Sequence, residues 1–135
     1  MVIDTNIFVS SFFGGNPEKI ISLWKNGKII LCLSKEIIEE YAEVLSRFGL
    51  KHQRELKELL NLFSKRFNMF FISSTPTIKI IKSDPSDNKF IKCAVSCNVN
   101  FIITGDMHLK ILKQYKNIKI INPENFMAVF NRQTL

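Results

Sequence analysis

Short apolar runs alternate along the chain with longer segments in which apolar residues recur every three or four positions. The runs lie at Val2–Ile3, 29–33, Met69–Ile72, Phe101–Ile103 and Ile118–Ile121. Short apolar runs separated by amphipathic helical segments are typical of parallel strands joined by crossover helices. The pattern therefore predicts an α/β fold, a three-layer α/β/α sandwich with a central parallel sheet of about five strands.

Three of the expected helices have recognisable ends. Ser34 is a suitable N-cap for a helix whose apolar residues fall on one face and which should end near Gly49. A second amphipathic helix is expected over residues 52–67. The Asp-Pro pair at 84–85 is typical of a helix start, so a third helix is expected from there to about Asn98.

Composition indicates one domain that attracts polyanions. A chain of 135 residues that is 46% hydrophobic is long enough for a single core, and no linker or repeat divides it, so one domain over residues 1–135 is expected. The formal charge of +7 favours nucleic acid as a partner. The chain has no apolar stretch near the roughly 18 residues that span a bilayer, so a cytoplasmic location without a membrane partner is expected. Three cysteines without C-x-x-C spacing are interpreted as reduced core thiols.

Four acidic residues should meet at one edge of the predicted sheet. Parallel strands end at the same edge, and right-handed crossovers return the chain to the opposite edge. Asp4 and Asp106 each follow a predicted strand directly. Glu40 lies in the second turn of one predicted helix and Asp87 lies at the start of another, and both helices follow strands. We therefore expect these four carboxylates to lie close together.

Helical periodicity indicates which acids point inward. Asp87 projects from the middle of the apolar face that Phe90 defines, and Glu40 lies at the margin of the apolar face of its own helix. The neighbouring Glu39 falls on the outward side, so the periodicity favours Glu40 as the inward acid. An inward carboxylate needs a compensating partner because an isolated buried charge is costly.

Each acid alone also has a structural interpretation. Asp4, Asp84, Asp87 and Asp106 could cap turns or helices, and Glu40 could pair with a lysine. Together they are harder to explain without a cation, because two carboxylates about 4 Å apart repel by roughly 4 kcal/mol at an effective dielectric constant near 20. Oxygen ligands suit Mg²⁺ or Mn²⁺, and the two histidines lack zinc-like spacing and stay unassigned.

Four motifs that occur in order resemble those of PIN-domain ribonucleases. They are V-I-D-T-N at 2–6, S-K-E-I-I-E-E-Y at 34–41, D-P-S-D-N-K-F-I-K-C-A at 84–94 and I-T-G-D-M-H-L at 103–109. A further stretch, I-I-N-P-E-N-F at 120–126, is similar to the last strand and helix of the family. The resemblance covers almost the whole chain and points to the small single-domain PIN proteins that are toxins of VapBC-type toxin–antitoxin pairs.

The resemblance implies a metal-dependent endoribonuclease. The positions that match the family's catalytic and metal-binding acids are Asp4, Glu40, Asp87 and Asp106, and those that match supporting polar residues are Asn6 and Thr104. A bound Mg²⁺ or Mn²⁺ ion would activate water for hydrolysis of RNA, leaving a 5′-phosphate and a 3′-hydroxyl. The implied partners are RNA, a protein antitoxin and a second copy of the chain in a homodimer. Asp84 also matches a motif residue, but its N-cap position explains it.

Two alternatives stay open at this point. A haloacid-dehalogenase-like phosphatase also begins with a strand that ends in an acid motif, but here Asn6 and Lys110 stand where that class has acids. Release of phosphate from a small phosphomonoester would favour it. The other alternative is a non-catalytic RNA- or partner-binding module with the same fold, which RNA binding without cleavage in Mn²⁺ would favour.

Overall fold

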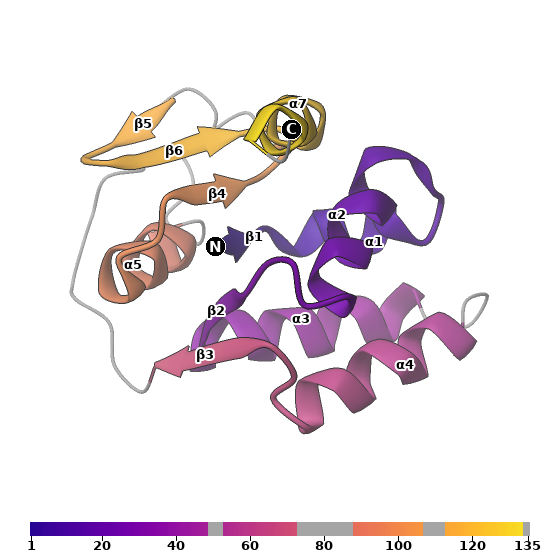
Figure 1. The fold of residues 1–135 in the computed structure, drawn as a ribbon. Coiled ribbons are helices and arrows are strands. Elements are labelled where there is room, and N and C mark those ends of the chain that lie inside the picture. Colours follow the sequence, from indigo (N-terminus) through magenta and orange to yellow (C-terminus); the bar gives the residue numbers. More distant parts are fainter. Residues whose placement is uncertain (49–52, 73–87, 107–112, 134–135) are drawn as a thin grey trace.

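The computed structural model describes residues 1–48, 53–72, 88–106 and 113–133 of the chain, which form an α/β fold (Figure 1). The strands are β1 (Val2–Ile3), β2 (Leu31–Ser34), β3 (Met69–Ile72), β4 (Phe101–Ile103), β5 (Gln114–Tyr115) and β6 (Ile118–Ile121). The helices are α1 (Thr5–Ser11), α2 (Gly15–Lys25), α3 (Lys35–Phe48), α4 (Gln53–Ser64), α5 (Asn88–Cys97) and α7 (Pro123–Gln133). The α/β class predicted from the apolar runs is confirmed.

All five predicted strands form, but they belong to two hydrogen-bonded ladders. One sheet has the order β1-β4-β6-β5, and β2 pairs with β3 separately. The pairs β1–β4, β4–β6 and β2–β3 are parallel, as predicted. The expected single five-stranded sheet is not fully formed because β1 is only two residues long and its ladder partner is β4. Met1 links the two ladders, since its amine donates to the Ile30 carbonyl at 2.7 Å and its carbonyl accepts from the Cys32 N–H at 2.8 Å.

The antiparallel edge strand β5 was not predicted. It pairs with β6 across a tight turn at Lys116 and Asn117, and Lys116 has a φ of +53°. A strand of two residues is too short to show the alternation that identifies a half-buried strand in a sequence. The hairpin adds an edge strand to the sheet on the side opposite β1.

The helix that carries Glu40 begins where the sequence predicts. The Ser34 hydroxyl accepts a hydrogen bond from the Ile37 N–H at 3.3 Å, which confirms Ser34 as the N-cap of α3. α3 is described to Phe48, and the expected stop at Gly49 lies outside the described residues.

The other two predicted helices also form. α4 ends three residues before its predicted end at residue 67, and Arg66 and Asn68 then adopt positive φ angles of 53° and 44°. α5 ends at Cys97, one residue before its predicted end, and Asn98 has a φ of 54°. The predicted start of α5 at the Asp-Pro pair lies outside the described residues.

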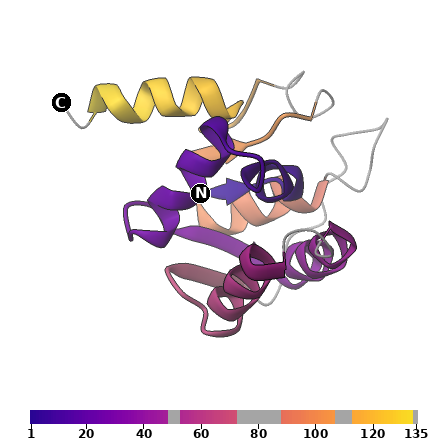
Figure 2. The same ribbon diagram turned by 90° about the vertical axis from the view of Figure 1, so that its right-hand side faces the viewer.

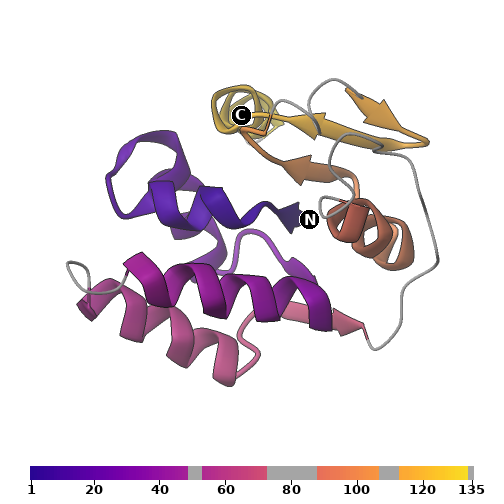
Figure 3. The ribbon, with the colours of Figure 1, turned by 180° about the vertical axis from the view of Figure 1, so that it is seen from behind.

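Helices α3 and α5 pack against the strands around a buried core. α5 contacts β1, β2, β3 and β4, and α3 contacts β2, α1 and α5. Figure 2 shows α7 at one end of the molecule, where it contacts α2, and Figure 3 shows α3 and α4 lying side by side. Buried aromatic rings of Phe8, Trp24, Tyr41 and Phe63 pack together between these helices. α1 and α3 thereby hold fixed positions next to the end of β1.

The three cysteines fit their expected role as core thiols. Cys32 and Cys93 are buried, Cys97 is half-buried, and none forms a disulfide. Burial raises the pKa of the Cys97 thiol to about 11 and that of Cys93 further, so both stay protonated at neutral pH. Among the described helices, none is long and apolar enough to cross a membrane.

The N-cap of α3 gives a first prediction. Ser34→Ala should lower the free energy of unfolding by about 1 kcal/mol, because it removes the acceptor for the Ile37 N–H. Ser46→Ala, in the exposed part of the same helix, should change it by less than about 0.5 kcal/mol. Urea unfolding followed by circular dichroism measures both values, and equal effects of the two substitutions would contradict the capping role.

Candidate active site

Asp4 is a buried carboxylate at the junction of β1 and α1. The residue is 4% exposed, and its backbone N–H donates to the Ile103 carbonyl at 2.9 Å, which continues the β1–β4 ladder by one residue. Its backbone occupies the N-cap position of α1, but its side chain does not cap the helix. The backbone N–H of Asn6 nevertheless acts on the Asp4 carboxylate and lowers its pKa, so the turn-capping interpretation of Asp4 stays open.

Thr104 connects Asp4 to Asp106. The fully buried Thr104 hydroxyl donates to Asp4 Oδ2 at 2.6 Å and accepts the backbone N–H of Asp106 at 2.9 Å. The Thr104 N–H donates to the Ile121 carbonyl at 3.0 Å, which fixes its position beside β6. One hydroxyl thus orients the Asp4 carboxylate and the backbone that carries Asp106.

The electrostatic environment of Asp4 includes two other acids. Burial is the largest cause that raises the pKa of Asp4 above its usual value. The hydrogen bond from Thr104 and the nearby backbone N–H of Asn6 lower it, and the charges of Asp106 and Glu40 raise it further. Three of the four predicted acids therefore share one electrostatic environment at the end of the strands.

Glu40 reaches this environment from α3. Its side chain is 27% exposed, whereas that of Glu39 is 64% exposed, so Glu40 is the inward acid of the pair. The Thr5 hydroxyl donates to Glu40 Oε2, and the Lys89 ammonium contacts Glu40 Oε1 at 2.5 Å. Both carboxylate oxygens of Glu40 are thereby engaged by side chains from α1 and α5.

Tyr41 donates a hydrogen bond to the backbone at the same end of β1. Its ring is fully buried against Phe8, and its hydroxyl donates to the Ile3 carbonyl, one residue before Asp4. Burial raises the pKa of Tyr41 well above its usual value, and the charge of Asp4 raises it further. Tyr41 therefore acts as a neutral hydrogen-bond donor that fixes the backbone of the residue before Asp4.

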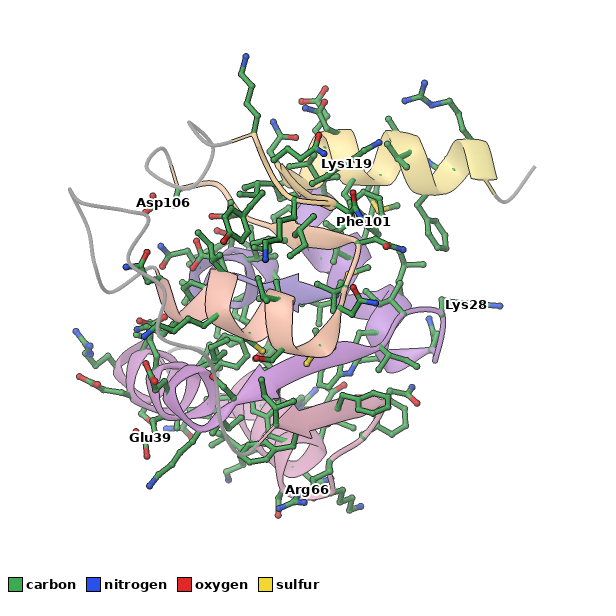
Figure 4. All side chains as sticks on the ribbon, turned by 90° about the vertical axis from the view of Figure 1, so that its left-hand side faces the viewer. Lys28, Glu39, Arg66, Phe101, Asp106 and Lys119 are labelled. Atoms are coloured by element: carbon green, nitrogen blue, oxygen red, sulfur yellow. The ribbon has the colours of Figure 1, made fainter. Side chains whose placement is uncertain are left out.

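Asp106 lies beyond the end of β4 on the side of the molecule that carries the other acids. Figure 4 shows Asp106 and Glu39 of α3 on one side and Lys28 on the opposite side. Asp106 is half-buried. This is the edge predicted from the strand directions.

The remaining predicted residues have different outcomes. Asp87 lies outside the described residues, as do Asp84 and both histidines. Asn6 is exposed, and its side chain makes no hydrogen bond within the described parts of the chain. Thr104 hydrogen-bonds the Asp4 carboxylate and the backbone of Asp106.

Sequence reasoning did not identify three residues that contact the site. Thr5, Tyr41 and Lys89 adjoin predicted acids in the sequence or lie within two residues of them. Lys89 belongs to the same quoted motif as Asp87, so the motif contained the signal. Their contacts could not be derived from periodicity, because each partner comes from a different element.

The donor set suits a hard divalent cation. Among the described residues, no three histidine, cysteine or acidic side chains converge tightly enough to hold an ion. Asp4, Glu40 and Asp106 nevertheless offer only oxygen ligands, and the buried charge of Asp4 is opposed by two neighbouring acids. Carboxylate oxygens that repel each other are the ligands that Mg²⁺ and Mn²⁺ use in proteins. The chemistry of these donors fits such an ion, and Asp87 lies outside the described residues.

Comparisons with known proteins identify the family of the chain and proteins with a similar fold. Residues 1–108 match a family model described as PIN domain. The fold is similar to a chain in the crystal structure of VapBC2 from Rickettsia felis bound to a DNA fragment from their promoter, with a TM-score of 0.55 and 17% identity over 90% of this chain and 96% of that chain. A search of curated proteins found no match. The family match gives no support to the phosphatase alternative.

The raised pKa of Asp4 gives a second prediction. Asp4→Asn should raise the free energy of unfolding of the metal-free protein at pH 7 by about 1 kcal/mol, because it removes a buried charge that Asp106 and Glu40 repel. In the wild type, the free energy of unfolding should fall as the pH rises through the folded-state pKa of Asp4, because the buried carboxyl then becomes charged. The variant should lack this part of the pH dependence.

Urea unfolding in EDTA at pH 5 and pH 7 measures this effect. Glu39→Gln makes the same charge change at an exposed position and should alter stability by less than about 0.5 kcal/mol at either pH. An Asp4→Asn protein that is less stable than the wild type in EDTA would show instead that the Asp4 charge stabilises the fold.

Proposed function

Because the chain belongs to the PIN-domain family, we propose that it is a metal-dependent endoribonuclease that hydrolyses RNA phosphodiester bonds. The observation that carries the proposal is the position of buried Asp4 at the end of β1, where one hydroxyl, that of Thr104, binds both its carboxylate and the backbone of Asp106 at the end of β4. An acidic site on a chain with a net charge of +7 combines ion binding with attraction to a polyanion.

A divalent ion, Mg²⁺ or Mn²⁺, is proposed as the cofactor. Carboxylate oxygens of Asp4, Asp87 and Asp106 would hold it, with Glu40 beside them. Such an ion supplies positive charge at the scissile phosphate and makes water a stronger nucleophile.

The residues around Asp4 prepare it for this role. Thr104 holds one carboxylate oxygen of Asp4, and Tyr41 holds the backbone of the preceding residue. Burial disfavours the charged form of Asp4 in the absence of a cation, and a bound cation would favour that form. A carboxylate that is already oriented loses little conformational freedom on binding, which favours a fixed geometry for in-line attack at phosphorus.

RNA binding is proposed to depend on backbone phosphates. The excess of lysine and arginine supplies a sequence-independent attraction that weakens steeply with salt. Cleavage is proposed to leave a 5′-phosphate and a 3′-hydroxyl.

A protein antitoxin is the proposed physiological partner. The similarity to the chain from the VapBC2 complex supports this class of partner. Large apolar side chains at the surface, Phe13 at 72% and Phe70 at 65% exposure, offer area for protein contacts. We further propose that the chain is a cytoplasmic toxin that forms a homodimer. Within each copy, the β1-β4-β6-β5 sheet and the β2–β3 pair are proposed to act as one layer covered by helices on both faces.

Loss of the proposed ligands gives a third prediction. Asp4→Asn and Asp106→Asn should each lower the rate of RNA cleavage in Mn²⁺ by about a hundredfold or more, since each removes a carboxylate that would hold the ion. Cleavage of an end-labelled RNA, with product ends identified by phosphatase sensitivity, measures the effect.

The control is Glu39→Gln, which should cleave at the wild-type rate because Glu39 is exposed. EDTA should stop cleavage by the wild type, and excess Mn²⁺ should restore it. Wild-type activity that persists in EDTA, or full activity of Asp4→Asn, would overturn the proposed function.

A further inference from the structure

Glu40 is held from two sides by side chains that are distant in the sequence. The Thr5 hydroxyl donates to Oε2, and the Lys89 ammonium lies 2.5 Å from Oε1. The ion pair is shielded, with 14% of the Lys89 side chain and 27% of the Glu40 side chain exposed. A divalent ion bound at Oε1 would lie close to the Lys89 ammonium, and the repulsion between the two cations opposes binding of the ion to Glu40.

The position of Lys89 is set by its helix. It lies in the first turn of α5, which contacts α3, the helix of Glu40. Asn88 before it and Phe90 after it are buried, and the Lys89 ammonium also lies 5.8 Å from the centre of the Phe90 ring. Anchored on both sides by buried neighbours, Lys89 presents a fixed positive charge to the acidic site.

We propose that Lys89 is a resident cation of the acidic site, which keeps Glu40 outside the ligand set of the divalent ion and weakens the binding of that ion. The inference rests on the proposed function for the existence of the ion site. It assigns Glu40 and Lys89 as positioning residues that act as a neutral pair, whereas Asp4 and Asp106 bind the ion directly. The site then retains its ion less tightly than four free carboxylates would.

The pair has a distinctive electrostatic consequence. A unit positive charge close to a divalent ion opposes its binding, and a unit negative charge favours it, at a strength that depends on distance and local dielectric. Removing either partner alone should shift the affinity for the ion in opposite directions. Removing both should leave the affinity nearly unchanged, because the pair carries no net charge.

Calorimetric titration of the full chain with Mn²⁺, at low ionic strength and without RNA, tests this inference. Lys89→Gln should lower the Kd for Mn²⁺ by about tenfold, and Glu40→Gln should raise it by about tenfold. The double variant should have a Kd within about threefold of the wild type. Lys89→Arg, which keeps the charge, should also stay within about threefold.

A matched control comes from a second ion pair between helices. Lys25 and Glu58 are 2.8 Å apart on α2 and α4, which carry none of the candidate acids. Lys25→Gln makes the same charge change and breaks a similar contact, and it should leave the Kd for Mn²⁺ unchanged. Cooperative thermal unfolding of each variant establishes that it is folded.

The outcomes separate this inference from the proposed function. The inference is overturned if Lys89→Gln leaves the Kd for Mn²⁺ unchanged. It is also overturned if the double variant binds Mn²⁺ at least tenfold more weakly than the wild type, because Glu40 would then be a ligand of the ion. A wild type that binds Mn²⁺ but leaves RNA intact contradicts the nuclease and not the role of Lys89. Absence of Mn²⁺ binding by both the wild type and Lys89→Gln overturns both.

Discussion

The buried carboxylate of Asp4 is the constraint on which the site depends. It lies where β1 ends, and the parallel pairing of β1 with β4 brings Thr104 to within hydrogen-bond distance of it. A charge at this depth is tolerated only with compensation, and the neighbouring acids make the demand larger. The fold therefore favours a positive charge at this position, which connects the hydrogen-bond geometry of two short strands to the proposed ion-dependent chemistry.

Charge is distributed unevenly around this place. The chain as a whole is basic, yet three acids meet at one end of the strands and Lys89 offsets one of them. A basic protein attracts RNA over distances comparable to the Debye length, whereas a small acidic pocket acts only over a few ångströms on ions. These two distance ranges are consistent with the proposal that one molecule binds a polyanion and a cation at neighbouring positions.

Much of this organisation could be predicted from the sequence, for identifiable reasons. The strands could be found because each is an apolar run, and Asp4 and Asp106 followed from the rule that parallel strands end at one edge. Glu40 was distinguished from Glu39 by helical periodicity, and the side-chain exposures agree. The contacts of Glu40 with Thr5 and Lys89 could not be predicted, because they join residues 35 and 49 positions apart whose rotamers depend on the packing of three helices. The division of the strands between two ladders could not be predicted, because it depends on β1 contributing only two residues to a ladder.

Diffraction from crystals grown with Mn²⁺, with data collected at the manganese absorption edge, tests the central claim most directly. The account predicts an anomalous peak within about 2.5 Å of carboxylate oxygens of Asp4 and Asp106. A fully occupied manganese peak elsewhere on the molecule, with none beside Asp4, would contradict it.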